Sequence, residues 1–349
     1  AVLSLLAGSS SEPVRTFSVG FDDAEQYDER RYARLLADRF GTAHHELVVS
    51  AADIGNRLPL MVEHLDEPVT DPAMIPTWIL SEYARKEVTV VLTGEGADEL
   101  FAGYRRYLYQ KKYGWVAAMP AAGRIARSGL RRRLPGRAGQ AIAALAESDP
   151  GLNHVEWSMI IDPYTGQGLF GEHEFRRIRL GLGRWFGRYF EKAPSRLSGS
   201  LYADQNEWLP HNLLSKVDRA TMAFSLEARV PFLDHRLVEW AARLPDSHRI
   251  SSGVTKQVLR RAFRDDLPDE ILVRPKRGFD LPLGEWIRGP LLPVVKEMFR
   301  DKSLRRWNGL RGDYAAGMLE KHLTGKAELG LPLFNLLSIL LFLEKAERS

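Results

Sequence analysis

Apolar and polar positions follow two different periods along the first hundred residues. A period-two alternation over 14–21 and again over 44–49 predicts two β-strands. A short apolar run over 88–92, bounded downstream by glycine, predicts a third strand, buried within a parallel sheet. Helices are expected over 1–8, 27–40 and 51–64. This strand–helix–strand order predicts an α/β fold with a doubly wound parallel sheet.

The pattern changes to helices beyond residue 107. Positions 140–200 are amphipathic at the helical period, and the apolar run 331–343 predicts a packing helix at the end of the chain. The sequence therefore predicts three parts. These are an α/β part over 1–113, a basic helical insertion over 114–200 and a helical part over 201–349.

Composition narrows the class of protein. The chain has 349 residues, of which 44% are hydrophobic and 27% charged, as in a globular protein of one large or two modest domains. Its lack of cysteine excludes disulfides, thiolate metal sites and cysteine nucleophiles in this chain. No apolar run reaches the roughly 18–20 residues of a membrane span, and no signal peptide is visible. We therefore expect a cytoplasmic protein that does not enter a membrane.

The net charge of +4 suits anionic ligands such as nucleotides. The basic segment 110–137 includes several aromatic side chains nearby, which raises nucleic-acid binding as an alternative. A solvated helical face explains the same pattern, so no nucleic-acid partner is expected. His44 and His45 do not predict a metal site, because neighbours on a strand point to opposite faces.

The letters TGEG at 93–96 follow the strand predicted over 88–92. Ligands of open α/β sheets bind at the carboxyl ends of strands, and glycines let a backbone approach a ligand closely. Glu95 and Asp98 are three residues apart, so on one helical turn they would share a face. Carboxylates of this kind hold Mg²⁺ together with substrate phosphates. The alternative is that the acids merely favour the positive end of a helix dipole.

Two later segments also carry candidate chemistry. Lys256, in GVTKQVLRRAF, falls near a predicted helix start, where a cation is unfavourable unless an anionic ligand binds. Arg229, in SLEARVPFLD, could clamp a carboxylate or phosphate through two hydrogen bonds, with Glu227 orienting it. The alternatives are a surface lysine and a buried structural ion pair.

These segments resemble the asparagine synthetase family. TGEGADELFAGY is similar to a glycine- and acid-rich segment of that family, with Thr93 in place of a common serine. EARVPFLD is close to a second family signature, and TFSVGFDD, GTAHHEL and PKRGF are similar to three further ones. The resemblance covers about 10–107 and 200–290.

The resemblance implies a fold, a reaction and roles for residues. The fold would be the PP-loop ATP pyrophosphatase type of the adenine nucleotide alpha hydrolase-like class. ATP and Mg²⁺ would adenylate a carboxylate, most simply that of aspartate, and ammonia would then give asparagine, AMP and pyrophosphate. The implied catalytic residues are Glu95, Lys256, Arg229 and Glu227. Asp98 would bind the metal, and the implied nucleotide contacts are Val19, Thr93, Gly94, Gly96 and Lys276.

Two parts that the family uses are not found in this sequence. The chain contains no cysteine nucleophile of a glutaminase domain, so ammonia would come from a domain missing here. The SGGxDS phosphate loop is expected immediately ahead of residue 1, and the chain by itself is expected to bind ATP poorly.

Three alternatives remain. The substrate could be the carboxylate of a polysaccharide or natural product. A β-lactam synthetase-like cyclase shares the implied fold. Such cyclases resemble the family but have tyrosine at the position of Glu95, so Glu95 argues against this alternative. The chain could also be a non-catalytic scaffold. A homodimer is left open as an assembly.

Overall fold

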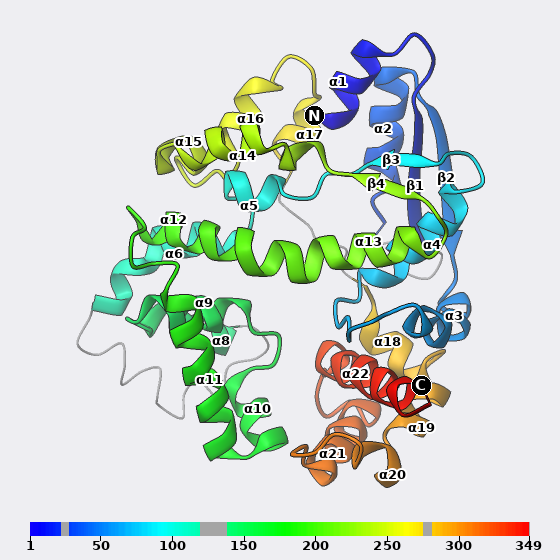
Figure 1. Cartoon of the computed structure of the whole chain (residues 1–349), viewed down its shortest axis with the longest axis vertical. Coiled ribbons are helices and arrows are strands. Elements are labelled where there is room, and N and C mark those ends of the chain that lie inside the picture. Colours follow the sequence, from blue (N-terminus) through cyan, green and yellow to red (C-terminus); the bar gives the residue numbers. More distant parts are fainter. Residues whose placement is uncertain (22–27, 119–137, 275–280, 349) are drawn as a thin grey trace. The chain divides into compact units, whose positions relative to one another are not determined.

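The computed structural model describes residues 1–21, 28–118, 138–274 and 281–348 (Figure 1). The chain divides into two compact units, and each combines segments that are distant in sequence. Unit 1 comprises Ala1–Glu95, His211–Pro231 and Ala262–Ser349, and unit 2 comprises Gly96–Pro210 and Phe232–Arg261. The three-part division expected from the sequence separates the chain by the functions expected of its parts. That division stays a prediction.

Unit 1 carries all the described strands. Its elements are α1 (Val2–Ser9), β1 (Arg15–Phe21), α2 (Arg30–Phe40), β2 (Ala43–Val49), α3 (Ala51–Glu63), α4 (Met74–Ala84), β3 (Val90–Leu92), α13 (Ser215–Met222), β4 (Glu227–Arg229), α17 (Asp269–Leu272), α18 (Leu283–Arg288), α19 (Leu292–Met298), α20 (Asp301–Leu304), α21 (Gly312–Leu323) and α22 (Gly330–Arg348).

The predicted strand–helix–strand start of the chain is confirmed. Strands β1 and β2 pair in parallel along their whole length, and α2 connects them. Helix α2 ends at Gly41, whose φ of 60° lies in the left-handed region that glycine adopts readily. On β2, His44 Nδ1 lies 2.8 Å from Thr16 Oγ1, while the His45 ring stacks on Phe17. The two histidines therefore point to opposite faces, as the strand period requires.

The strand predicted over 88–92 is shorter than expected and is not buried. It forms as β3, whose Val90 and Leu92 are 39% and 40% exposed. In the described part of the chain β3 pairs only with β4, in parallel, so little covers it. The described strands thus form two separate two-stranded parallel sheets, and one doubly wound sheet stays a prediction.

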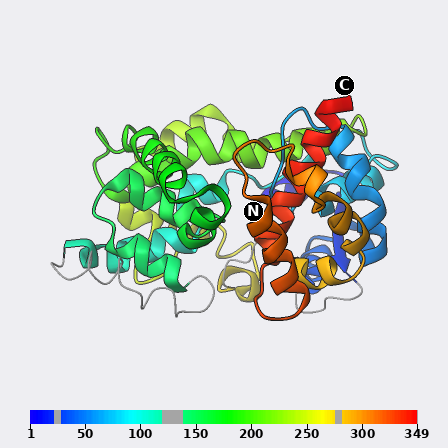
Figure 2. The same ribbon diagram turned by 90° about the horizontal axis from the view of Figure 1, so that it is seen from below.

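The apolar run near the end of the chain forms a packing helix, as predicted. Helix α22 buries one side chain after another from Leu333 to Leu341. It packs against α3 and α18, which come from opposite ends of the sequence. Figure 2 shows this red helix among the orange helices that precede it. Unit 1 is therefore completed by the last part of the chain.

The regular elements among the described residues of unit 2 are helices, and one isolated antiparallel bridge joins Ser251 and Val254. The helices are α5 (Ala97–Phe101), α6 (Arg105–Tyr113), η2 (Gly114–Ala118), α8 (Ala138–Ala146), α9 (Pro150–Ser158), α10 (Pro163–Phe170), α11 (Glu172–Gly187), α12 (Arg196–Ala203), α14 (His235–Ala242), α15 (Asp246–Arg249) and α16 (Gln257–Ala262). The π-helical η4 (Asp204–Leu214) and the short η5 (Pro231–Leu233) begin in one unit and end in the other.

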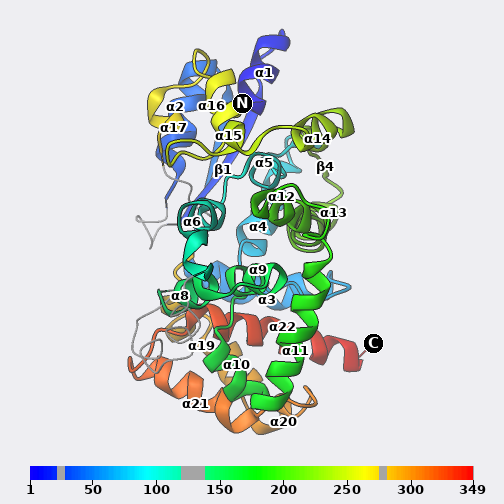
Figure 3. The same cartoon turned by 90° about the vertical axis from the view of Figure 1, so that its left-hand side faces the viewer.

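The core of unit 2 joins its two chain segments. Tyr107 and Leu201 pack with Ile250 in one buried cluster, and Phe101 packs with Ala241 in another. Helices α9 and α11 lie side by side (Figure 3). None of the described helices combines the length and the apolarity needed to cross a bilayer.

Candidate functional site

Two motifs that are far apart in sequence lie side by side in unit 1. The Glu227 N–H donates to Thr89 O at 2.9 Å, and the Thr93 N–H donates to Arg229 O at 2.9 Å. Between these bonds, Val90 pairs with Glu227 in the parallel register of β3 and β4. Backbone pairing therefore holds the TGEG turn beside the EAR segment.

Two oxygens of the TGEG turn are buried and have no hydrogen-bond partner among the described residues. They are Thr93 Oγ1 and Glu95 Oε2. Buried polar atoms in folded proteins are ordinarily paired, so an orphan is a sign of a bound molecule or a catalytic role. Gly94 lies between these two residues in the sequence. A Cβ added at Gly94 would meet no atom within 4 Å, so space is open beside this backbone.

Arg229 and Glu227 interact directly. Arg229 Nε donates to Glu227 Oε1 at 2.7 Å, and the two side chains are 65% and 55% exposed. The alternative of a buried structural ion pair is therefore wrong. An exposed pair contributes little to stability, and the bond to Glu227 is made by Nε of the Arg229 guanidinium.

Glu95 and Asp98 do not share a helical turn, contrary to the sequence prediction. Helix α5 begins at Ala97, and Gly96 before it has a φ of 85° in the left-handed region. A Cβ at Gly96 would run into the Leu233 side chain. Only glycine fits this backbone without strain, and the turn it makes leaves Glu95 ahead of the helix.

Asp98 forms an ion pair with Lys256 inside unit 2. Lys256 Nζ lies 3.0 Å from Asp98 Oδ1, and both side chains are mostly buried. Gly103 makes room for the pair, because a Cβ there would overlap the Asp98 carboxylate and the Lys256 chain. Lys256 precedes α16 and its carbonyl accepts from the Arg260 N–H at 3.0 Å, which confirms its predicted place at a helix start.

Glu99, the third acid of the motif, has a different environment. It is 1% exposed, and it accepts a hydrogen bond from the Tyr104 hydroxyl. Burial raises the pKa of its carboxyl, and the Tyr104 hydrogen bond opposes that effect only in part. Its carboxylate is therefore enclosed by protein, whereas Asp98 faces a cation.

The role of Asp98 as a magnesium ligand stays a prediction. The described residues contain no group of three or more side chains that could hold a metal ion by themselves. Mg²⁺ sites often use one or two carboxylates and complete the shell with water and substrate phosphates. In such a site the ion would compete with Lys256 for the Asp98 carboxylate.

Val19 and Lys276 complete the predicted set. Val19 lies within β1 and its side chain is 7% exposed, as in an ordinary core strand. Lys276 lies outside the described residues. The nucleotide roles of both stay predictions.

The sequence analysis missed a buried ion pair in unit 1. Lys216 on α13 is 7% exposed, and its Nζ lies 2.9 Å from Asp71 Oδ2 in the loop before α4. Asn212 Nδ2 donates to the same carboxylate oxygen at 3.2 Å. The sequence signal was a lone lysine among buried helix positions. A buried lysine requires a partner for its charge. The loop is thus anchored by its Asp71 carboxylate.

Comparison with known proteins identifies the family of the chain. The family model described as asparagine synthase matches residues 1–344. This chain belongs to the asparagine synthase family. Its segments TGEG, EAR and VTK, described above, are thus parts of an asparagine synthase domain that occupies nearly the whole chain.

Two bacterial relatives are named as asparagine synthetases, and a fungal relative is named as an amidase. Asparagine synthetase 1 (glutamine-hydrolysing) of Bacillus subtilis is 31% identical over 90% of this chain and 49% of its own length. A putative asparagine synthetase of Mycobacterium tuberculosis H37Rv is 32% identical over 94% of this chain and 50% of its own. A Penicillium rubens protein named amidase chyE is 25% identical over 93% and 52%. The chain thus spans about half the length of these relatives.

Proposed function

We propose that this chain is the synthetase part of an asparagine synthetase-like amidotransferase. It activates a carboxylate with ATP and converts it into an amide with ammonia. The observation that carries the proposal is the pair of buried oxygens without partners, Thr93 Oγ1 and Glu95 Oε2, in a turn of an asparagine synthase-family chain. A reacting group bound beside the turn would give both oxygens a partner.

The first step joins the substrate to AMP. A carboxylate oxygen attacks the α-phosphorus of ATP, the bond to the bridging oxygen breaks, and pyrophosphate leaves with the electron pair. The Lys256 ammonium stabilises the negative charge on the α-phosphate. Mg²⁺ bound with ATP would neutralise phosphate charge, with Asp98 as its protein ligand. Arg229, oriented by Glu227, binds an anionic oxygen of the substrate or nucleotide.

The second step forms the amide. Ammonia attacks the acyl carbon, the bond from that carbon to the AMP oxygen breaks, and AMP leaves. Glu95 takes the proton that the nitrogen loses. Lys276 is assigned to the phosphates and Val19 to the adenine side of ATP. Thr93, Gly94 and Gly96 are assigned to the nucleotide. Ammonia would come from a glutaminase part outside this chain.

Aspartate is the proposed substrate, because the family and the bacterial relatives are named for asparagine synthesis. A second candidate is another small carboxylate. It is favoured by the similarity to a fungal protein named as an amidase rather than an asparagine synthetase. The two candidates share the activation step and differ in the acid that is activated.

Aspartate-dependent exchange between ATP and labelled pyrophosphate, with Mg²⁺, tests the proposal. It is measured on this chain and on a polypeptide extended upstream. Lys256→Ala should lower exchange about 100-fold or more, while Lys112→Ala, at an exposed lysine of α6, should not change it. Glu95→Gln should reduce amide formation more than exchange.

The outcomes separate the candidates. Exchange that requires aspartate and fails in Lys256→Ala supports asparagine formation. ATP binding without aspartate-dependent exchange moves the proposal to another carboxylate. An extended polypeptide that binds no ATP contradicts the enzyme and leaves a non-catalytic scaffold.

A further inference from the structure

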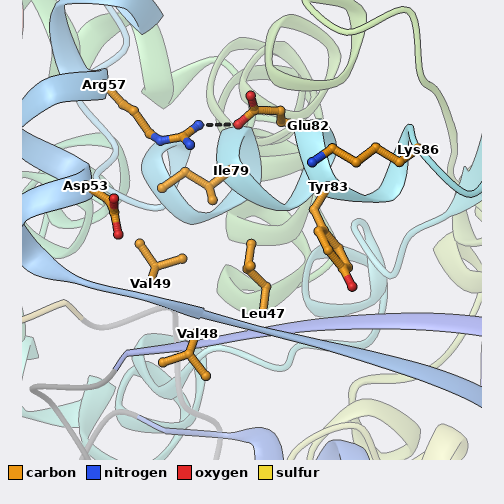
Figure 4. A pocket seen from close by; sticks show the side chains of 9 residues that line it. All are labelled: Leu47, Val48, Val49, Asp53, Arg57, Ile79, Glu82, Tyr83 and Lys86. Atoms are coloured by element: carbon orange, nitrogen blue, oxygen red, sulfur yellow. Dashed lines mark hydrogen bonds and ion pairs between the residues drawn. The ribbon is translucent and has the colours of Figure 1, made fainter.

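Unit 1 contains a small pocket that none of the residues assigned to the reaction lines. It has a volume of about 140 Å³ and lies between β2, α3 and α4 (Figure 4). A cavity of about 150 Å³ with apolar walls is large enough for a benzene molecule. The pocket therefore has room for a compact organic ligand and not for a nucleotide.

One wall of the pocket is apolar. Leu47 and Val49 are two residues apart on β2, so both side chains point to the same face of the strand, toward α4. Ile79 and Tyr83 are four residues apart on α4 and face them. This wall comes from two elements of unit 1 and suits a branched aliphatic or aromatic group.

The pocket is also lined by two carboxylates, those of Asp53 and Glu82, and by two cations, those of Arg57 and Lys86. Glu82 lies in the last turn of α4, and Lys86 follows two residues beyond the end of that helix. Glu82 is bound by Arg57 of α3. Lys86 has no acidic partner among the described residues, and its ammonium lies 5.9 Å from the centre of the Tyr83 ring. Figure 4 shows this ammonium directed inward, toward the other side chains that line the pocket.

We propose that this pocket binds a small organic carboxylate with a branched aliphatic or aromatic body. The carboxylate accepts a hydrogen bond from the Lys86 ammonium, and the body contacts Leu47, Val49 and Ile79. An inorganic anion would leave the apolar wall exposed to water, and a neutral hydrocarbon would leave Lys86 without a partner. The inference is independent of the reaction proposed above, because the two use different residues.

The test uses the 349-residue chain and two matched pairs of probes. Benzoate is compared with benzamide, and 3-methylbutanoate with 3-methylbutanamide, by saturation-transfer NMR titration. Each pair differs in charge and hardly in shape. From the usual efficiency of small ligands we expect a Kd of about 1 mM for the acids. The amides should bind at least about fivefold more weakly, as expected for loss of one charge-assisted hydrogen bond at a partly open site.

Variants assign the effect to Lys86. Lys86 is exposed, so Lys86→Gln should fold, and it should weaken acid binding about fivefold, to the level of the amides. Arg85→Gln, at the adjacent exposed cation that does not line the pocket, is the control and should leave binding unchanged. Glu82→Gln frees Arg57 and should tighten acid binding.

Three results would overturn the proposal. The first is the absence of binding by either acid up to about tenfold above the expected Kd. The second is equal affinity of acid and amide. The third is unchanged acid affinity in Lys86→Gln. Binding of leucine in place of 3-methylbutanoate would support the proposal and identify an amino acid as the source of the carboxylate.

Discussion

Lys256 combines a backbone cost with a side-chain role. Its φ of 52° lies in the left-handed region, where a residue with a Cβ is strained. Its ammonium nevertheless pairs with Asp98. Strained residues of this kind persist where the surrounding structure holds them, and they cluster at functional sites.

The backbone cost at Lys256 can be separated from the ion pair. Lys256→Ala and Lys256→Gly both remove the ammonium, but only glycine adopts this φ without strain. We expect the glycine variant to be about 1 kcal/mol more stable than the alanine variant. Urea unfolding of both measures the difference. Equal stabilities would show that the backbone relaxes.

Glu99 predicts a dependence of stability on pH. Because burial raises the pKa of its carboxyl, the folded state keeps a proton that the unfolded chain loses near the ordinary value of 4.5. Its contribution to stability is therefore present below that pH and is lost as pH rises through the raised pKa. Glu99→Gln should gain stability relative to the parent between pH 4.5 and pH 8.

Urea unfolding at those two pH values measures the gain. Glu12→Gln, at an exposed glutamate of unit 1, is the control for loss of a carboxylate. The measured quantity is the difference in unfolding free energy between Glu99→Gln and the parent. The same difference at both pH values would show that the Glu99 carboxyl titrates alike in the folded and unfolded chain.

At the scale of elements, one buried carboxylate connects three helical segments of unit 2. Asp204 is the first residue of η4. Its Oδ2 lies 2.7 Å from Arg106 Nη2 of α6, and its Oδ1 lies 3.4 Å from His154 Nε2 of α9. It also accepts a hydrogen bond from the Tyr107 hydroxyl. Burial opposes its ionisation, but the charges of Arg106 and His154 hold its pKa below the ordinary value.

Removing that carboxylate should weaken the whole unit. Asp204→Ala leaves the Arg106 guanidinium buried without its anion, which costs about 3–5 kcal/mol. Asp234→Ala is the matched control, because Asp234 is a partly exposed helix cap whose loss costs about 1 kcal/mol. Chemical unfolding of the two variants checks the ratio. Similar losses would mean that water replaces Asp204 around Arg106.

At the scale of the whole molecule, the order of the sequence is not the order of the structure. Unit 1 is assembled from three separate segments of the chain, and its last helix, α22, packs on α3 near the beginning. Asn335 donates to Thr70 O at 2.7 Å, so side chains also connect these distant segments. Unit 1 therefore requires both the first and the last of its segments.

A deletion of residues 330–349 should destabilise unit 1 and spare unit 2. Hydrogen exchange should accelerate in α3 and α18, which lose their apolar partner, while α9 and α11 of unit 2 keep their protection. Leu337→Ala, at a fully buried position, should cost about 2–5 kcal/mol. Glu347→Ala, which removes an ion pair whose glutamate is exposed, should cost less than about 1 kcal/mol. Loss of protection in all four helices would show that the units unfold together.

Local patterns were enough to predict the start and the end of the fold. The alternation over 14–21 and 44–49 predicted two strands, because side chains on a strand alternate between faces whatever surrounds them. The helix between the two strands predicted their parallel pairing. The left-handed cap at Gly41 and the packing helix over 331–343 follow from equally local rules. The short motifs were sufficient to indicate the family, and the roles of their residues stay predictions.

Contacts between distant segments could not be predicted in this way. The pairing of β3 with β4, the Asp98–Lys256 ion pair and the burial of Lys216 against Asp71 each join parts of the chain that no local pattern connects. The prediction that Val90 and Leu92 would be buried was also wrong. An apolar side chain is buried only when another element covers it. The sequence by itself determined which local elements form and which segments mark the family. The tertiary structure alone decided which of those segments meet, because that depends on the packing of whole elements.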